Sequence, residues 1–363
     1  MFKRSISITL FLTTIVAVHP GQAQNASEAD MPVAPLAAVE FRGWTNAIVL
    51  RNPLVELAVA PSVGRIVQLS FKGGENLLRF DSSLQGVVPG SADEQTWLNV
   101  GGDWLWPVAQ STWPSFADTD WPPPKALAEA EWTGTAWKDA DGAQSCLLTR
   151  EYGDPLHIRV NRLIKLDREA ARVSIRQRIE RLNASEIPVT LWNITQIAGA
   201  EKVILPVDKG SMFEQGLQPL IFGMPGEEQL TRCNGAAVYD ATSGEFKLCS
   251  DSKRGWIAAL KGDVLIIEQA RGDTANGTYP DGGCTVEMYS NAGLGYTEIE
   301  TLSVEVPLKP GESLQNMLVV DMVPAGTNRT ACALAQQVCD ALGEKNDTPA
   351  IEDSPVMPVA GNE

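Results

Sequence analysis

The sequence predicts an all-β protein built as one large antiparallel β-sandwich. Short segments such as 65–71 and 173–179 alternate apolar and polar residues with a period of two, and Gly, Pro, Asn or Asp turns separate them. Helical periodicity is scarce along the chain. Because all-β sandwiches often exceed 200 residues as one unit, we expect a single domain over residues 36–342.

The strands are expected in consecutive pairs. Residues 55–59 run into a Pro-containing turn, and 65–71 run into Gly73 and Gly74, which predicts a hairpin with one buried face. Residues 157–163 and 173–179 alternate in the same way and are expected to pair. The same rhythm predicts further strands at 256–260, 264–269, 284–289, 296–306 and 315–322.

Residues 97–124 interrupt this rhythm. They are dense in Trp, Pro, Asp and Gly and follow neither period, so we expect a long irregular loop, which in a compact domain is usually functional. Indole rings stack on the apolar faces of sugars, whose hydroxyls need polar groups nearby. The candidate sugar contacts here are Trp104, Trp106, Trp113 and Trp121, with Asp103 and Gln110 as polar partners. The alternative is that these tryptophans only pack the loop onto the sandwich.

Both ends of the chain are expected to lie outside this domain. Residues 1–23 hold two basic residues, an apolar run and a small-residue ending, which predicts a secretory signal peptide. Residues 24–35 read as a polar leader and 343–363 as a disordered tail. We therefore expect a periplasmic or secreted protein.

The charge of the chain excludes several partners. The net charge is −16 and the basic residues are dispersed, whereas binding to a phosphate backbone needs clustered Lys and Arg. Nucleic acid is therefore excluded as a partner. No segment reaches the roughly 18 consecutive apolar residues of a membrane helix, so no membrane insertion is expected. The oligomeric state stays open.

Six cysteines in an exported chain predict disulfides, although the sequence does not fix their pairing. If 331–342 is helical, Cys332 and Cys339 lie about 10.5 Å apart along its axis, beyond the roughly 7 Å that a disulfide spans, so they should not pair. There is no Cys-x-x-Cys pair and no calcium-loop spacing. We expect no structural zinc site and no cofactor, and the presence of a calcium ion stays open.

Three segments resemble the galactose-mutarotase-like superfamily. The first is VELAVAPSVGRIVQLSFKGGENLLRF at 55–80, which looks like the family's opening strands. The second is GGDWLWPVAQSTW at 101–113, which is similar to a Gly-Gly-x-x-x-Trp-Pro loop of uncharacterised exported bacterial members. The third is TVEMYSNAGLGYTEIETLSVEVPLKPGESLQNMLVV at 285–320, which looks like the family's acidic strand and last strand. The resemblance implies a large antiparallel sandwich that acts on or binds carbohydrates.

The residues that the family uses for catalysis have only partial counterparts in this sequence. The family uses a glutamate and histidines to move protons, but the chain after residue 23 has one histidine, His157, which is expected on a polar strand face. Asn193 is followed by Ile194 where the family has an Asn-His pair. The segments that resemble the catalytic glutamate strand offer Glu287, Glu298 and Glu300 as alternative bases, and exposed carboxylates that only aid solubility are the other interpretation. Arg65 and Asn193 are candidate substrate contacts, although Arg65 could equally be paired at the rim of the sheet.

Three functions follow as hypotheses. The leading one is an exported carbohydrate-binding protein. The second is a sugar-active enzyme, an epimerase or lyase-like protein with a strand glutamate as base and Tyr289 or Tyr296 in place of the missing histidine. The third is a non-catalytic envelope scaffold that has kept the fold without the site.

Overall fold

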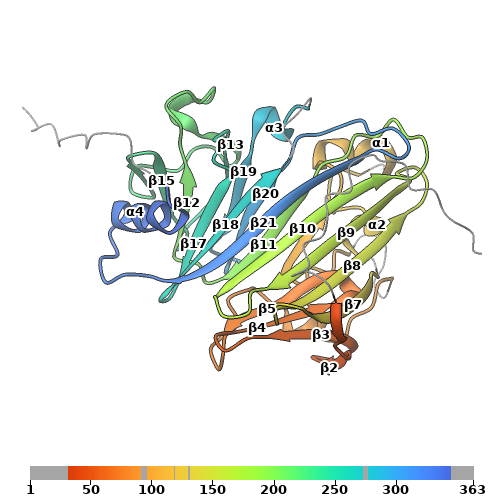
Figure 1. Cartoon of the computed structure of the whole chain (residues 1–363). Coiled ribbons are helices and arrows are strands. Elements are labelled where there is room, and N and C mark those ends of the chain that lie inside the picture. Colours follow the sequence, from red (N-terminus) through yellow and green to blue (C-terminus); the bar gives the residue numbers. More distant parts are fainter. Residues whose placement is uncertain (1–31, 91–95, 118, 130, 273–276, 345–363) are drawn as a thin grey trace, which may run out of the picture.

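The computed structural model describes residues 32–90, 96–117, 119–129, 131–272 and 277–344. They form two large antiparallel sheets, which confirms the all-β sandwich (Figure 1). The expected signal peptide, most of the polar leader and the tail from residue 345 lie outside the described residues.

The two sheets have 11 and 10 strands. The first sheet runs in the order β1 (Pro32–Pro35), β7 (Thr133–Asp139), β8 (Gln144–Tyr152), β9 (Ile158–Leu166), β10 (Arg172–Arg181), β21 (Ser313–Pro324), β18 (Val264–Gly272), β17 (Trp256–Lys261), β12 (Lys202–Pro206), β15 (Ala236–Asp240) and β14 (Leu230–Cys233). The second sheet runs in the order β13 (Gln218–Ile221), β16 (Glu245–Ser250), β19 (Val286–Asn291), β20 (Tyr296–Leu302), β11 (Trp192–Ala198), β6 (Asp103–Trp106), β5 (Arg65–Phe71), β4 (Val55–Ala60), β3 (Trp44–Arg51) and β2 (Val39–Phe41). The α-helices are α1 (Pro114–Ala117), α2 (Lys125–Ala128), α3 (Pro280–Gly283) and α4 (Ala331–Leu342).

The paired strands expected from the sequence are present. β4 and β5 form an antiparallel pair, and β9 pairs with β10 along its length. His157 itself lies just before β9, with a φ of 49°, so its place on a strand face was wrong. β1 lies inside the segment expected to be a polar leader, so the described fold begins before residue 36.

The expectation of a long irregular loop at 97–124 was wrong for β6. This strand is inserted in the middle of the ten-stranded sheet, between β5 and β11. Gly101 and Gly102 allow this insertion, because both have positive φ and a Cβ on Gly102 would lie 2.2 Å from the carbonyl oxygen of Ile66. All four residues of β6 are buried, so the strand shows no alternation of apolar and polar residues.

Two disulfides join distant segments. Cys233 of β14 is bonded to Cys332 of α4, and Cys249 of β16 is bonded to Cys284. Cys332 and Cys339 are therefore not paired with each other, as predicted.

A buried polar cluster connects the two sheets across the apolar core. Arg162 of β9 donates to Asp103 of β6 at 2.6 Å and to Asn193 of β11 at 2.9 Å. Asn193 also donates to Asp103 at 2.7 Å, and Thr195 of β11 donates to Glu268 of β18 at 2.5 Å. Burial, followed by the nearby charge of Asp103, raises the pKa of Glu268 to about 8. These five residues, the inter-sheet cluster, therefore fix how the two sheets face each other.

Removing Arg162 should strongly destabilise the fold. Arg162→Ala leaves the buried Asp103 carboxylate without its cation, which costs about 3–5 kcal/mol of unfolding free energy. Urea denaturation measures this loss. The matched control is Arg159→Ala on the same strand, whose ion pair with Glu151 is exposed and contributes little. Equal destabilisation by the two substitutions would contradict the role given to the inter-sheet cluster.

Candidate functional site

A cavity of about 660 Å³ lies on one face of the ten-stranded sheet. Its floor comes from β11, β16, β19 and β20, and its walls come from the end of β6 and from the segments around residues 97, 121 and 222. The lining residues are Arg79, Trp97, Asn99, Trp106, Gln110, Trp121, Ile194, Ile221, Phe222, Glu245, Lys247, Tyr289, Asn291, Leu294, Tyr296, Glu298 and Glu300.

Strand alternation decides which residues face this cavity. Asn193 and Thr195 point toward the other sheet, so Ile194 between them points away from it, into the cavity. Ile194 lies opposite Glu300 on β20, and Glu298 lies two residues before Glu300 on the same face. The cavity is therefore on the outer face of the sheet.

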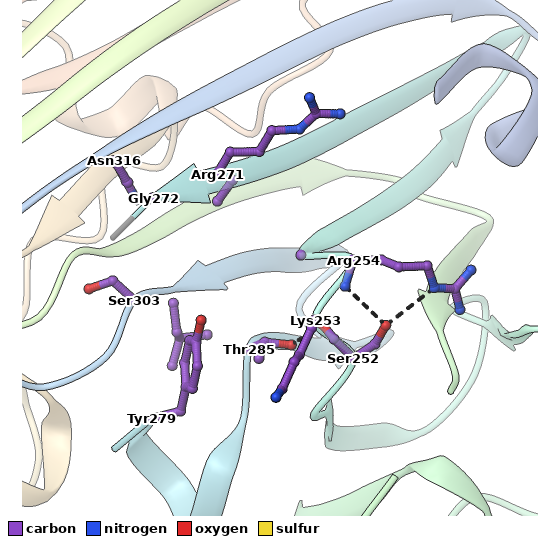
Figure 2. Close-up of a pocket in the computed structure, with 12 residues that line it drawn as sticks. Ser252, Lys253, Arg254, Arg271, Gly272, Tyr279, Thr285, Ser303 and Asn316 are labelled. Carbon is purple, nitrogen blue, oxygen red and sulfur yellow. Dashed lines mark hydrogen bonds between the residues drawn. The ribbon is translucent and has the colours of Figure 1, made fainter. Parts of the chain in front are cut away.

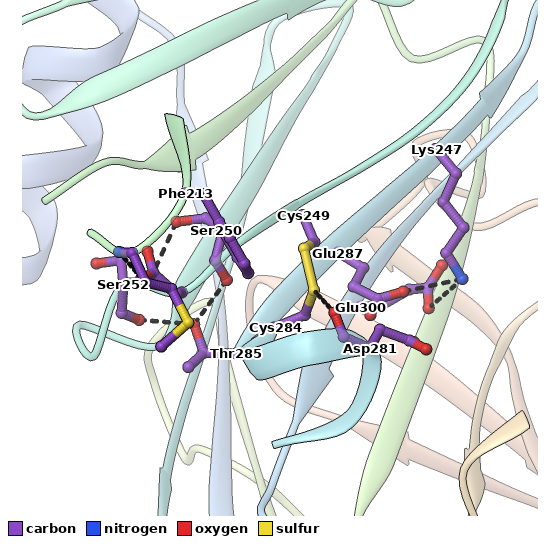
Figure 3. The surroundings of a disulfide bond; sticks show 12 residues. Phe213, Lys247, Cys249, Ser250, Ser252, Asp281, Cys284, Thr285, Glu287 and Glu300 are labelled. Atoms are coloured by element: carbon purple, nitrogen blue, oxygen red, sulfur yellow. Dashed lines mark hydrogen bonds and ion pairs between the residues drawn. A yellow bond between two sulfur atoms is a disulfide. The ribbon is translucent and has the colours of Figure 1, made fainter. Parts of the chain in front are cut away.

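One lysine and several carboxylates form the polar part of the floor (Figure 3). Lys247 Nζ lies 2.9 Å from Glu287 Oε2 and 3.5 Å from Glu300 Oε2. Trp192 Nε1 donates to Glu300 Oε2 at 2.6 Å, and Gln196 donates to Glu298 Oε1 at 2.6 Å. We call Lys247, Glu287, Glu298 and Glu300 the lysine–carboxylate cluster.

Three members of the lysine–carboxylate cluster have pKa values that differ from their usual values. Burial, followed by the charge of Glu300, raises the pKa of Glu298 to about 7. Burial also raises the pKa of Glu287, against the opposing effect of Lys247. Burial by itself lowers the pKa of Lys247, but the neighbouring Glu287 and Glu300 outweigh it and raise that pKa. Lys247 is thus held as a cation, and Glu298 can exchange a proton near neutral pH.

Aromatic rings form the opposite wall. The rings of Trp97 and Trp121 meet edge to face, with their centroids 5.1 Å apart. Trp106 is held from behind by Trp113, at 4.8 Å, and by Trp104, at 6.0 Å. Trp106 is 5% exposed, and its Nε1 finds no hydrogen-bond partner among the described residues. The wall therefore offers rigid apolar faces.

The mouth of the cavity is apolar and exposed. Trp121 is 54% exposed, Ile221 46%, Phe222 57% and Leu294 64%. Large apolar side chains gathered at an open cavity usually mark a binding site. We therefore take this cavity as the candidate functional site.

Seven of the residues singled out in the sequence meet here. The cavity is lined by Trp106, Gln110, Trp121, Tyr289, Tyr296, Glu298 and Glu300, and Glu287 lies at its edge in contact with Lys247. Both alternative glutamate segments converge, because Glu287 of β19 is directly opposite Glu300 of β20.

The other candidates for substrate contact are placed elsewhere. Asp103 and Asn193 belong to the inter-sheet cluster, so they are buried on the inner face of the sheet. Arg65 is buried beneath Trp104, 3.9 Å from its ring centroid, and donates to the carbonyl of Gly101. Trp104 and Trp113 are fully packed behind Trp106. As ligand contacts these five are corrected: they support the cavity without lining it, because Asp103 and Asn193 face the inner side of the sheet and the other three are buried by their neighbours.

Several lining residues were missed by sequence reasoning. Arg79 and Asn99 lie in segments that were singled out but were not themselves recognised, and Glu245 and Lys247 come from a segment that carried no motif. Glu245 and Lys247 alternate with Phe246 and Leu248, which does predict a strand with one polar face. The missing information was the pairing of β16 with β19, which no local pattern reveals.

A second cavity of about 320 Å³ lies at the ends of β17 and β18 (Figure 2). Ser252, Thr285, Ser303 and Asn316 contribute polar groups, and Tyr279 is the one aromatic residue in its described lining. It lacks the aromatic wall of the larger cavity and is less suited to stacking a sugar ring.

Solved structures place the chain in a known class. It is similar to a galactose mutarotase-like protein from Clostridium acetobutylicum, with 11% identity, a TM-score of 0.53, and coverage of 81% of this chain and 99% of the other. It is similar to a putative aldose 1-epimerase from Klebsiella pneumoniae subsp. pneumoniae, with 12% identity, a TM-score of 0.51, and coverage of 82% and 85%. The protein thus has the galactose-mutarotase-like fold, and the resemblance found in the sequence is confirmed.

A family model identifies the chain more specifically than the fold does. The model of the Domain of unknown function (DUF4380) matches residues 45–319, and the chain belongs to this family. A comparison with curated proteins gives no match.

Within the described ranges, no three His, Cys, Asp or Glu residues are grouped so as to hold a metal ion. Nor is any described helix long and apolar enough to cross a membrane.

Titration of Glu298 should be visible in the fluorescence of the cavity tryptophans. Because its pKa is about 7, intrinsic emission should change with a midpoint near pH 7. Glu298→Gln should abolish this transition. His157→Gln removes the one histidine of the described residues and should retain it. A transition that persists in Glu298→Gln and disappears in His157→Gln would assign the titration to the histidine instead.

Proposed function

We propose that this protein binds a carbohydrate in the 660 Å³ cavity. The observation that carries the proposal is the pairing of an aromatic wall with a polar floor in one open cavity. Trp97, Trp106 and Trp121 can stack on the apolar face of a pyranose ring, while Lys247 and Glu298 can bond its hydroxyls.

The shape of the site supports binding over a purely structural role. A scaffold that had lost its site would have the tryptophan segment packed closed against the sandwich. Here Trp121 is more than half exposed beside an open cavity. Rigid rings held from behind by Trp113 and Trp104 keep the wall in place before a ligand arrives, which lowers the entropic cost of binding.

We also propose that the protein works in the periplasm or outside the cell. The signal-like residues 1–23 support this location. The two disulfides support it as well, because such bonds persist in oxidising compartments.

A sugar screen by tryptophan fluorescence tests the binding function. One class of sugar should produce a saturable change, and Trp121→Ala should weaken its binding about tenfold or more by removing a stacking face. The matched control is Trp137→Phe, because Trp137 lies on β7 of the other sheet. If no sugar in a broad panel changes the emission up to millimolar concentrations, the binding function is wrong.

A second candidate function is proton transfer on the bound sugar. It is favoured by Glu298, whose pKa of about 7 suits a general base at neutral pH. The accompanying acid would be a tyrosine of the cavity. Tyr289 already donates to Glu245 at 2.6 Å, and burial raises its pKa to about 12, so it is a weak acid. Because the cavity has a suitable base but only a weak acid, we favour sugar binding over catalysis as the function.

Polarimetry of fresh aldose solutions tests the catalytic candidate. If Glu298 is a base, the protein should accelerate interconversion of the anomers, and Glu298→Gln should lower that rate about 100-fold or more. The exposed Glu151→Gln provides the matched control. A rate equal in Glu298→Gln and in the unmodified protein would exclude this base.

A further inference from the structure

The cavity carries more negative than positive side chains. Glu245, Glu298 and Glu300 line it as carboxylates, and Lys247 and Arg79 line it as cations. In a second layer, Glu287 contacts Lys247 and Asp81 contacts Arg79. Five carboxylates thus face two cations.

Neither cation is free to neutralise Glu298. Lys247 lies between Glu287 and Glu300, and Arg79 lies 3.5 Å from Asp81 and donates to the carbonyl of Asn99 at 2.7 Å. Arg79 reaches Glu298 only through Gln196, which accepts from Arg79 at 3.1 Å and donates to Glu298 at 2.6 Å. Among the described residues no cation forms a salt bridge with Glu298, although the charges of Lys247 and of the buried Arg65 lower its pKa from a longer distance.

A buried acceptor is also left open. Glu300 is 1% exposed, and its Oε1 has no hydrogen-bond partner among the described side chains and backbone. A buried carboxylate oxygen without a donor is unfavourable, because it has lost its water. Glu300 thus adds unsatisfied negative charge to the lining of the cavity, on the same strand face as Glu298.

The aromatic wall adds to this preference. The faces of Trp and Tyr rings carry negative charge density and attract cations. Trp97, Trp106, Trp121, Tyr289 and Tyr296 all line the cavity beside the carboxylates. The carboxylates and the aromatic rings thus both favour a positively charged ligand.

We propose that the ligand of this cavity is an amino sugar, whose ammonium group binds between Glu298 and Glu300 while its ring stacks on the tryptophans. The inference rests on the proposed carbohydrate function and specifies its ligand class. The ammonium forms a salt bridge with Glu298 and lies beside the negative charge of Glu300. Burial is the main cause of the raised pKa of Glu298, and the neighbouring charge of Glu300 adds to it. A uronic acid would add a further carboxylate and is disfavoured.

Calorimetric titration with matched sugar pairs tests the inference. The probes are glucosamine with glucose, galactosamine with galactose and mannosamine with mannose, so that each pair differs only at the 2-substituent. At pH 7.5, the amino sugar of at least one pair should bind about tenfold or more tightly than its neutral partner, because a charge-assisted hydrogen bond replaces a neutral one. Glucuronic acid should bind more weakly than glucose.

Two changes should remove the preference. Glu298→Gln should lower the affinity ratio to below about threefold, and the exposed Glu151→Gln should leave it unchanged. In the unmodified protein the ratio should also fall at pH 5.5, because Glu298 is then protonated.

The outcomes separate this inference from the function on which it rests. Equal or tighter binding of the neutral sugars would overturn the amino-sugar inference and leave carbohydrate binding intact. A preference that survives Glu298→Gln undiminished would overturn the assigned ammonium position. Absence of binding by every sugar would overturn the proposed function together with the inference.

Discussion

The alternation of side chains along β6, β11 and β20 is the constraint on which the rest of the structure depends. It divides the polar residues at the centre of the ten-stranded sheet into two sets. Asp103 and Asn193 point inward and join the opposite sheet through Arg162. Glu298 and Glu300 point outward and form the floor of the cavity. A shift of one residue in strand register would exchange these sets, so the cluster that fixes the sandwich also fixes the site.

The cavity depends on this frame for its electrostatics. The floor lies on a buried strand face, where water does not screen the carboxylates, and so one lysine is insufficient to balance them. The disulfide between Cys249 and Cys284 holds β16 beside the start of β19, which carry Lys247 and Glu287 (Figure 3). Lys247 is therefore held beside Glu287 and Glu300 by the covalent frame as well as by attraction.

The sequence predicted the fold well and the site in part. Period-two alternation is a local property, so the strand pairs β4–β5 and β9–β10 could be anticipated. β6 could not, because a short strand buried on both faces has no alternating pattern, and its four residues therefore resembled a loop. Because β6 is buried, Trp104 takes part in packing and Asp103 belongs to the inter-sheet cluster. The roles of Lys247 and Arg79 could not be predicted, because they depend on long-range strand pairing and packing.

We propose that the larger cavity holds the sugar ring. A crystal structure of the protein soaked with the sugar that binds it most tightly would show where the ring lies. Density is expected for a pyranose ring against Trp97 and Trp121, with a polar substituent within hydrogen-bond distance of Glu298. Density for the ring in the 320 Å³ cavity beside Tyr279, with the larger cavity empty, would contradict it.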